Sequence, residues 1–170
     1  KHCHTQELLA DPKKLADFQA ELTKRGMRIS ALNTSCNPLW PSETGRQYEK
    51  SMYACVDLAE KLGVKKIVAM AGLPAGSPED VTPNWIVSTI SWPDFMAPSY
   101  DYQWEVTIAF WKKFAAYAKE HHIEQIAIEE FPGTMVWSAE TMLKLREATD
   151  PIIGINLDPS HMMILGADPI

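Results

Sequence analysis

Residues 52–72, MYACVDLAEKLGVKKIVAMAG, contain the pattern that decides the fold of this chain. Apolar residues recur every three or four positions from Met52 to Leu62, which is the spacing of one helical face, and Gly63 is a typical helix end. The run KIVAM at 66–70 is short and apolar, and Gly72 follows it, so we expect a buried strand there. The stretch therefore predicts a helix followed at once by a strand.

The same helix–strand unit recurs along the chain. We expect further helices over residues 12–25, 102–121 and 138–147, followed by strands over 27–33, 125–129 and 152–157. Parallel strands need a crossover between them, and here each crossover is a helix. Four such units with short connections predict a parallel α/β sheet.

Two architectures contain such a sheet, namely a (β/α)8 barrel and an open doubly wound sheet. Nucleotide-binding open sheets carry GxGxxG or GxxxxGK(S/T) after a strand, and neither motif follows any of the four strands. The fold class that we predict is therefore α/β, a (β/α)8 TIM barrel.

Composition and charge limit the classes of protein and of partner. The chain has 170 residues, 46% apolar and 22% charged, which excludes disordered, collagen-like and small disulfide-rich proteins. Its 16 Lys and Arg against 22 Asp and Glu give a net charge of -6, which opposes binding to nucleic-acid phosphates. We therefore expect no nucleic-acid partner.

Cysteine usage and hydropathy indicate the cellular location. Cys3, Cys36 and Cys55 are far apart in the sequence and form no CxxC pair, so reduced thiols are the simplest interpretation. No apolar run approaches the roughly 18 to 20 residues of a membrane span, and no signal peptide opens the chain. We expect a cytoplasmic protein that does not bind membranes.

One segment, residues 72–100, is longer than the usual connection in a compact domain. It contains five prolines together with Trp85, Trp92 and Phe95. Proline combined with tryptophan indicates an ordered lid, and a packed surface excursion is the alternative.

Polar residues at the carboxyl ends of the strands are the candidates for a site, because a (β/α)8 barrel builds its active site there. The four strand ends carry Asn33 with Asn37, Met70 with Gly72, Glu129 with Glu130, and Asp158 with His161. Side chains alternate along a strand. If the apolar residues beside them pack against helices, Glu129 and Asp158 both point into the barrel at the same rim.

Two inward carboxylates repel each other unless a proton or a cation lies between them. Oxygen ligands suit Mg²⁺ or Mn²⁺, and the imidazole of His161, three positions after Asp158, extends the range to Co²⁺ or Zn²⁺. The alternative is that Glu129 and Asp158 each pair with a Lys or Arg, or face solvent.

These residues also carry a family resemblance that spans nearly the whole chain. The matching stretches are EEFPG at 129–133, ETMLKLRE at 140–147, NLDPSH at 156–161, GADP at 166–169, ISALN at 29–33, NPL at 37–39 and PNW at 83–85. Together they resemble the sugar phosphate isomerase/epimerase family of the xylose-isomerase-like TIM-barrel superfamily. The Asp-Pro-Ser-His segment with its downstream Gly-x-Asp-Pro is the most specific part.

The resemblance implies that Glu129 and Asp158 ligate one divalent metal ion, which is Mn, Mg, Co or Zn, and that His161 lies beside it and contacts substrate. A histidine and a second glutamate from the last two strands complete the site in the family, and they are not assigned in this chain. The chain departs from its relatives at Phe131 and Trp40, where they often have histidine.

The implied function is a metal-dependent isomerase or epimerase of a sugar or sugar phosphate, an enzyme of carbohydrate metabolism. It moves a proton next to a carbonyl through a metal-stabilised enediolate, with Glu129 and His161 as catalytic residues. We predict His161, Asn37 and Trp92 as contacts to a small carbohydrate substrate, Trp92 by stacking on a sugar face. The oligomeric state, including a homo-oligomer, stays open.

Three other functions are alternatives to this one. A keto-polyol dehydratase resembling inosose dehydratase uses the same chemistry and differs only in the group that departs. A metal-free carbohydrate-binding barrel is the alternative outside catalysis. The superfamily also contains a DNA-repair endonuclease with three zinc ions, whose cluster needs histidines at earlier strand ends. The chain has no histidine between His4 and His121, which argues against the endonuclease.

The length of the chain bears on how much of a barrel it can form. A closed (β/α)8 barrel takes about 250 residues. The four predicted strands match the third to sixth of the family. We therefore expect residues 1–170 to form a single partial TIM-barrel domain that is truncated at both ends.

Overall fold

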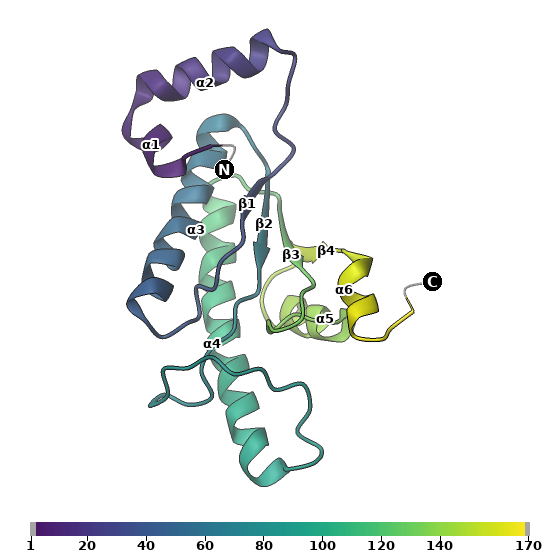
Figure 1. Ribbon diagram of the computed structural model, residues 1–170. Helices are drawn as coiled ribbons and strands as arrows, with labels where there is room; N and C mark the ends of the chain where they lie inside the picture. The colour runs from purple at the N-terminus through teal and green to yellow at the C-terminus, as the bar shows by residue number, and fades with distance from the viewer. Residues whose placement is uncertain (1–2, 169–170) are drawn as a thin grey trace.

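The computed structural model describes residues 3–168, so positions 1–2 and 169–170 of the expected 1–170 domain lie outside the described residues. The elements, in chain order, are α1 (Thr5–Ala10), α2 (Pro12–Lys24), β1 (Leu32–Thr34), α3 (Glu43–Leu62), β2 (Lys66–Met70), α4 (Pro93–Glu120), β3 (Gln125–Glu129), α5 (Ala139–Ala148), β4 (Ile153–Asn156) and α6 (Pro159–Ile164). Figure 1 shows their arrangement.

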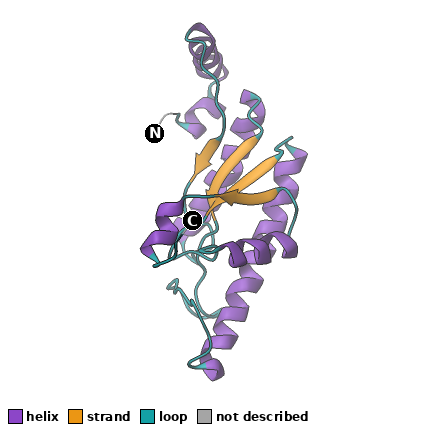
Figure 2. Ribbon diagram, turned by 90° about the vertical axis from the view of Figure 1, so that its right-hand side faces the viewer, coloured by secondary structure: helices purple, strands orange, loops and turns teal. Residues whose placement is uncertain are grey.

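The four strands form one parallel sheet in the order β1-β2-β3-β4, as Figure 2 shows. Consecutive strands are neighbours, and a helix connects each strand to the next. The predicted parallel α/β sheet is confirmed, and its order is that of consecutive strands in a barrel wall.

A helical layer covers one face of the sheet, and α3 and the C-terminal part of α4 run beside the strands (Figure 1). The strand residues on this face, among them Ile67, Ile126 and Ile153, are fully buried. Trp111 of α4 is also fully buried, and its indole N–H donates to the carbonyl of Ala71, 3.0 Å away. This apolar layer fixes the strand ends in place.

The opposite face of the sheet is only partly covered by the described residues. Across it, Val68, Ala127 and Gly154 lie in register, and all three are half-buried. One step further along the strands, Glu129 lies beside Met70 and Asn156. Glu129 therefore ends its strand on the face that turns away from the helices, as alternation predicted.

At β4 the alternation holds only in part. Ile153 packs in the core, whereas Ile155 is 39% exposed and Leu157 is 58% exposed. The expectation that the apolar residues alternating with Asp158 pack against helices therefore holds for Ile153 and is wrong for Ile155 and Leu157. β4 is an edge strand, and the residues described here supply no helix over its far end.

Two predicted boundaries need correction. The strand expected over 27–33 is limited to Leu32–Thr34. The helix expected over 102–121 begins at Pro93, so the last part of the supposed long loop is helical. Pro93 is suited to the first helical turn, and Pro98 removes only one backbone hydrogen bond from an exposed turn.

Hydrogen bonds anchor the rest of the long segment at several points, although side chains such as Val87 and Ile90 are exposed. The side-chain amide of Gln103 donates to the carbonyls of Pro74 and Asn84, at 3.1 and 2.7 Å. The indole N–H of Trp40 donates to the carbonyl of Val81, 3.0 Å away. These contacts support an ordered segment. No helix within residues 3–168 has the length and apolar character needed to cross a membrane.

Candidate metal centre

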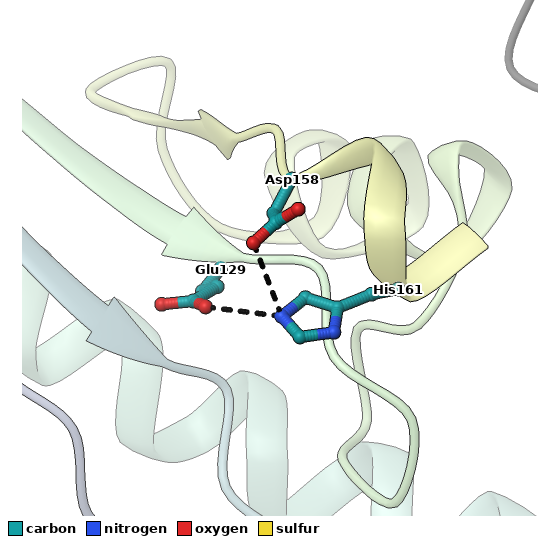
Figure 3. Close-up of side chains that lie close together, drawn as sticks. All are labelled: Glu129, Asp158 and His161. Carbon is teal, nitrogen blue, oxygen red and sulfur yellow. Dashed lines mark hydrogen bonds and ion pairs between the residues drawn. The ribbon is translucent and has the colours of Figure 1, made fainter. Parts of the chain in front are cut away.

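Three side chains from two successive strand ends point toward one another (Figure 3). Glu129 is the last residue of β3. Asp158 follows β4 as the N-cap of α6, and His161 lies in the first turn of that helix. Since β3 and β4 are paired and parallel, both ends meet at the same edge of the sheet.

The geometry of this cluster is tight. The Nε2 atom of His161 lies 3.3 Å from Oε1 of Glu129 and 3.5 Å from Oδ2 of Asp158. One candidate ligand atom from each residue lies within 4.8 Å of the other two. The side chains of His161 and Glu129 are 15% and 18% exposed, and that of Asp158 is 44% exposed.

Ser160 fixes the orientation of Asp158. Its backbone N–H and its hydroxyl both donate to Oδ1 of Asp158, at 3.0 and 2.7 Å. The hydroxyl bond, then the backbone bond, lowers the pKa of Asp158 below 3.8, and the charge of His161 adds to this. Oδ1 is thus used within the turn, and Oδ2 faces the cluster.

The donor set fits a divalent cation. Within residues 3–168, no Lys or Arg forms an ion pair with Glu129 or Asp158, so the alternative of separate cationic partners is not what the structure shows. Two carboxylates and one imidazole are ligands that Mg²⁺, Mn²⁺ and Zn²⁺ accept. Glu129 and Asp158 would hold such an ion, with the imidazole of His161 beside it.

Two neighbours of the cluster, Glu130 and Phe131, were noted in the sequence without a predicted role. The ring of Phe131 lies edge-on to the imidazole of His161, with centroids 4.4 Å apart. Glu130 is 2% exposed, and its Oε2 has no hydrogen-bond partner among the described residues. Burial raises the pKa of Glu130, whereas the charge of His161 lowers it. The sequence signals were the strand end for Glu130 and, for Phe131, the departure from a family position that often holds histidine.

Asn37, predicted as a substrate contact, uses its amide to brace a loop. Its Nδ2 donates to the carbonyl of Leu73 at 2.9 Å, and its Oδ1 accepts from the N–H groups of Leu73 and Leu39 at 2.8 and 3.2 Å. The structure therefore joins Asn37 to the loop after β2, and its role toward substrate stays a prediction.

Trp92, the other predicted substrate contact outside the cluster, caps the start of α4 and is 63% exposed. Its ring stacks on Phe95 with centroids 6.3 Å apart. The first turns of α4 extend beyond the sheet (Figure 1). Stacking of Trp92 on a sugar stays a prediction.

Comparison with known proteins gives a family match over nearly the whole chain. The model of a family described as xylose isomerase-like TIM barrel matches residues 3–170. The chain is 45% identical over 170 residues to the uncharacterized protein YfiH of Bacillus subtilis. The alignment covers 99% of this chain and 54% of YfiH. The chain thus spans about half the length of this relative.

Solved structures share the fold at low sequence identity. The probable 3-DHS dehydratase AsbF of Bacillus anthracis matches with a TM-score of 0.67 and 16% identity, over 98% of this chain and 53% of AsbF. A barrel protein of Mycobacterium smegmatis in complex with magnesium has a TM-score of 0.61 and 16% identity, over 89% and 48% of the two chains. An L-ribulose 3-epimerase has a TM-score of 0.60 and 17% identity, over 88% and 47%.

Proposed function

Because this chain belongs to the xylose isomerase-like TIM barrel family, we propose that its protein is a divalent-metal-dependent isomerase or epimerase of a sugar or sugar phosphate. The predicted barrel class is confirmed by the same match. We also propose that this chain supplies about strands three to six of the barrel, since it spans about half the length of its relatives. The remaining metal ligands would then come from other strands.

The observation that carries the proposal is the convergence of Glu129, Asp158 and His161 at one edge of the sheet. Two carboxylates and an imidazole lie together there, with Nε2 of His161 3.3 Å from Glu129 and 3.5 Å from Asp158. Similar barrels include one in complex with magnesium and one that is an epimerase, and both matches support the same proposal.

Glu129 and Asp158 would hold the cation, with His161 beside them. When bound, a divalent cation polarises a carbonyl or hydroxyl oxygen as a Lewis acid. A carboxylate oxygen of Glu129 accepts the proton from the carbon next to the carbonyl, and in an isomerase it returns the proton to the neighbouring carbon on the same face. An epimerase would need a second acid on the opposite face, which would come from other strands of the barrel.

His161 performs a separate task in this proposal. Its Nε2–H donates a hydrogen bond to the substrate oxygen on which negative charge develops during proton transfer. The half-buried position of His161 strengthens that bond, because little water competes for the donor. Asp158 does not exchange protons, since its low pKa and its bonds to Ser160 keep it a carboxylate.

The experiment is incubation of the full-length protein and Mn²⁺ with a panel of ketoses, ketose phosphates and inososes in deuterated water. An isomerase or epimerase incorporates deuterium at a carbon next to the carbonyl and keeps the mass otherwise unchanged. A product lighter by one water would instead indicate a dehydratase, the alternative that AsbF exemplifies in this fold.

Two variants complete the design. Glu129→Gln removes the proton acceptor and should abolish exchange, whereas Glu140→Gln makes the same chemical change at an exposed site on α5 and should leave exchange intact. Carbohydrate binding without exchange in the wild-type protein would support a non-catalytic barrel and reject the proposed function.

A further inference from the structure

The imidazole of His161 has two nitrogens in different surroundings. Nε2 faces Glu129 and Asp158 at 3.3 and 3.5 Å. Nδ1 is buried, and no residue of the described chain forms a hydrogen bond with it. Buried side-chain nitrogens are usually held by a hydrogen bond, and Nδ1 of His161 has none within residues 3–168. Its orientation therefore depends on packing.

Phe131 supplies that packing. Its ring meets the imidazole at an interplanar angle of 64°, with 4.4 Å between the ring centroids. Edge-to-face contact is a preferred arrangement of two rings, because the positive edge of one lies against the negative face of the other. Rotation of the imidazole about its side-chain bonds would break this contact and would turn Nε2 away from the carboxylates.

A short turn holds Phe131 in place. The N–H of Phe131 donates to the carbonyl of Val136 at 3.1 Å, and the carbonyl of Phe131 accepts from the hydroxyl of Thr134 at 2.9 Å. Gly133 has a φ of 82°, which side chains rarely adopt, so the turn needs glycine there. The backbone of Phe131 is thus closed into a loop with its own hydrogen bonds.

A hydrogen bond also joins this turn to the loop after β2. The N–H of Met135 donates to the carbonyl of Gly72 at 2.9 Å. Asn37 then clamps Leu73, the next residue, through both atoms of its amide at 2.8 and 2.9 Å. Bonds between three strand ends therefore define where the Phe131 ring lies.

We infer that Phe131 is a positioning residue, which holds the imidazole of His161 in the orientation that presents Nε2 to Glu129 and Asp158. The effect on turnover rests on the proposed function, whereas the effect on the imidazole does not. The ring of Phe131 does not touch the reacting atoms and acts through His161 alone.

The test is nitrogen and proton NMR of the histidine rings in the full-length protein, with the His161 signals identified by their loss in His161→Gln. Phe131→Leu removes the aromatic edge and should shift or broaden the His161 signals while those of His121 and His122 stay unchanged. Phe131→Tyr keeps the ring and should retain the wild-type spectrum. Phe18→Leu removes a half-buried ring from α2 and is the matched control.

Kinetics provides the second measurement. Because the misplaced donor acts mainly in the transition state, kcat of Phe131→Leu should fall roughly tenfold or more, with KM changed much less. Phe131→Tyr keeps the ring and should retain the wild-type kcat. An equal loss of kcat in both variants would overturn the inference.

The two claims fail separately. Unchanged His161 signals in Phe131→Leu would overturn the inference whatever the activity. Absence of turnover by the wild-type protein would reject the proposed function and would leave the NMR comparison decisive. If Phe131→Leu does not fold, Phe131→Met fills the space without a ring, and its His161 spectrum decides in the same way.

Discussion

The Nε2 atom of His161 lies 3.3 Å from Oε1 of Glu129, although 32 positions separate the two residues in the sequence. The contact follows from the parallel pairing of β3 with β4, because both strands end at the same edge and α6 begins directly after β4. The candidate metal centre thus depends on sheet register as much as on the identity of its residues.

Replacing Ser160 with alanine should weaken metal binding at low pH. The hydroxyl of Ser160 is the largest cause that lowers the pKa of Asp158 below 3.8. A carboxyl with a lowered pKa stabilises the folded protein. This stabilisation is complete above the unfolded-state pKa of the carboxyl and is lost as the pH falls through its folded-state pKa. In Ser160→Ala the pKa of Asp158 rises, so the carboxylate is protonated, and the metal released, at a higher pH.

Carbon NMR of the Asp158 carboxyl during an acid titration measures this change. Ser160→Thr keeps a hydroxyl at the same position and should retain the low pKa. An identical titration midpoint in Ser160→Ala and the wild-type protein would show that the hydroxyl bond has no effect.

Replacing Glu130 with glutamine should change how stability depends on pH. Burial raises the pKa of Glu130 above 4.5. A carboxyl with a raised pKa stabilises the folded protein below its unfolded-state pKa, and this stabilisation is lost as the pH rises through its folded-state pKa. Glutamine does not ionise, so Glu130→Gln should lack this decline. Denaturant unfolding at several pH values above 4.5 measures it, and the exposed Glu140→Gln should keep the wild-type profile. Parallel profiles for Glu130→Gln and the wild type would contradict the prediction.

The phenol of Tyr117 should titrate unusually high. Its hydroxyl donates to Oδ1 of Asp57 at 2.5 Å, which is the main cause that raises its pKa from 10.0 to about 12. The resulting stabilisation is complete below pH 10 and is lost as pH rises toward about 12. In Asp57→Ala the ultraviolet signal of tyrosinate should appear at lower pH. No shift in that signal would show that the carboxylate does not control Tyr117.

Gly45 should not tolerate a side chain. An added Cβ would lie 1.9 Å from the backbone carbonyl oxygen of Trp40, so the start of α3 would have to move. Overpacking of this kind costs about 1–3 kcal/mol, and Gly45→Ala should lose that much free energy of unfolding. Gly154→Ala is the matched control, since its nearest contact would be Nη1 of Arg146 at 3.8 Å. Equal stability of the two variants would contradict the clash.

Periodicity and strand ends were enough to predict the sheet and to place Glu129 and Asp158 on one edge. These features are local, because alternation along a strand decides which face a residue occupies. Phe131 and Ser160 could not be assigned in that way. Their roles depend on where a ring or hydroxyl points after a turn, and several hydrogen bonds between distant loops decide that.

The start of α4 shows the same limit. Pro93 and Pro98 with nearby tryptophans indicated a loop, yet the chain there is helical. Proline is tolerated in a first turn, and packing of Trp104 and Trp111 further along the helix outweighs local propensity.

The most direct test of the proposed metal centre is calorimetric titration of Mn²⁺ into the full-length protein and two double variants. We expect one bound ion per chain in the wild type, and binding weakened roughly a hundredfold or more in Glu129→Gln/Asp158→Asn. Glu140→Gln/Asp101→Asn carries the same charge change at exposed positions and should bind like the wild type. Equal Mn²⁺ affinity in all three proteins, or no binding by the wild type, would contradict the proposed metal centre.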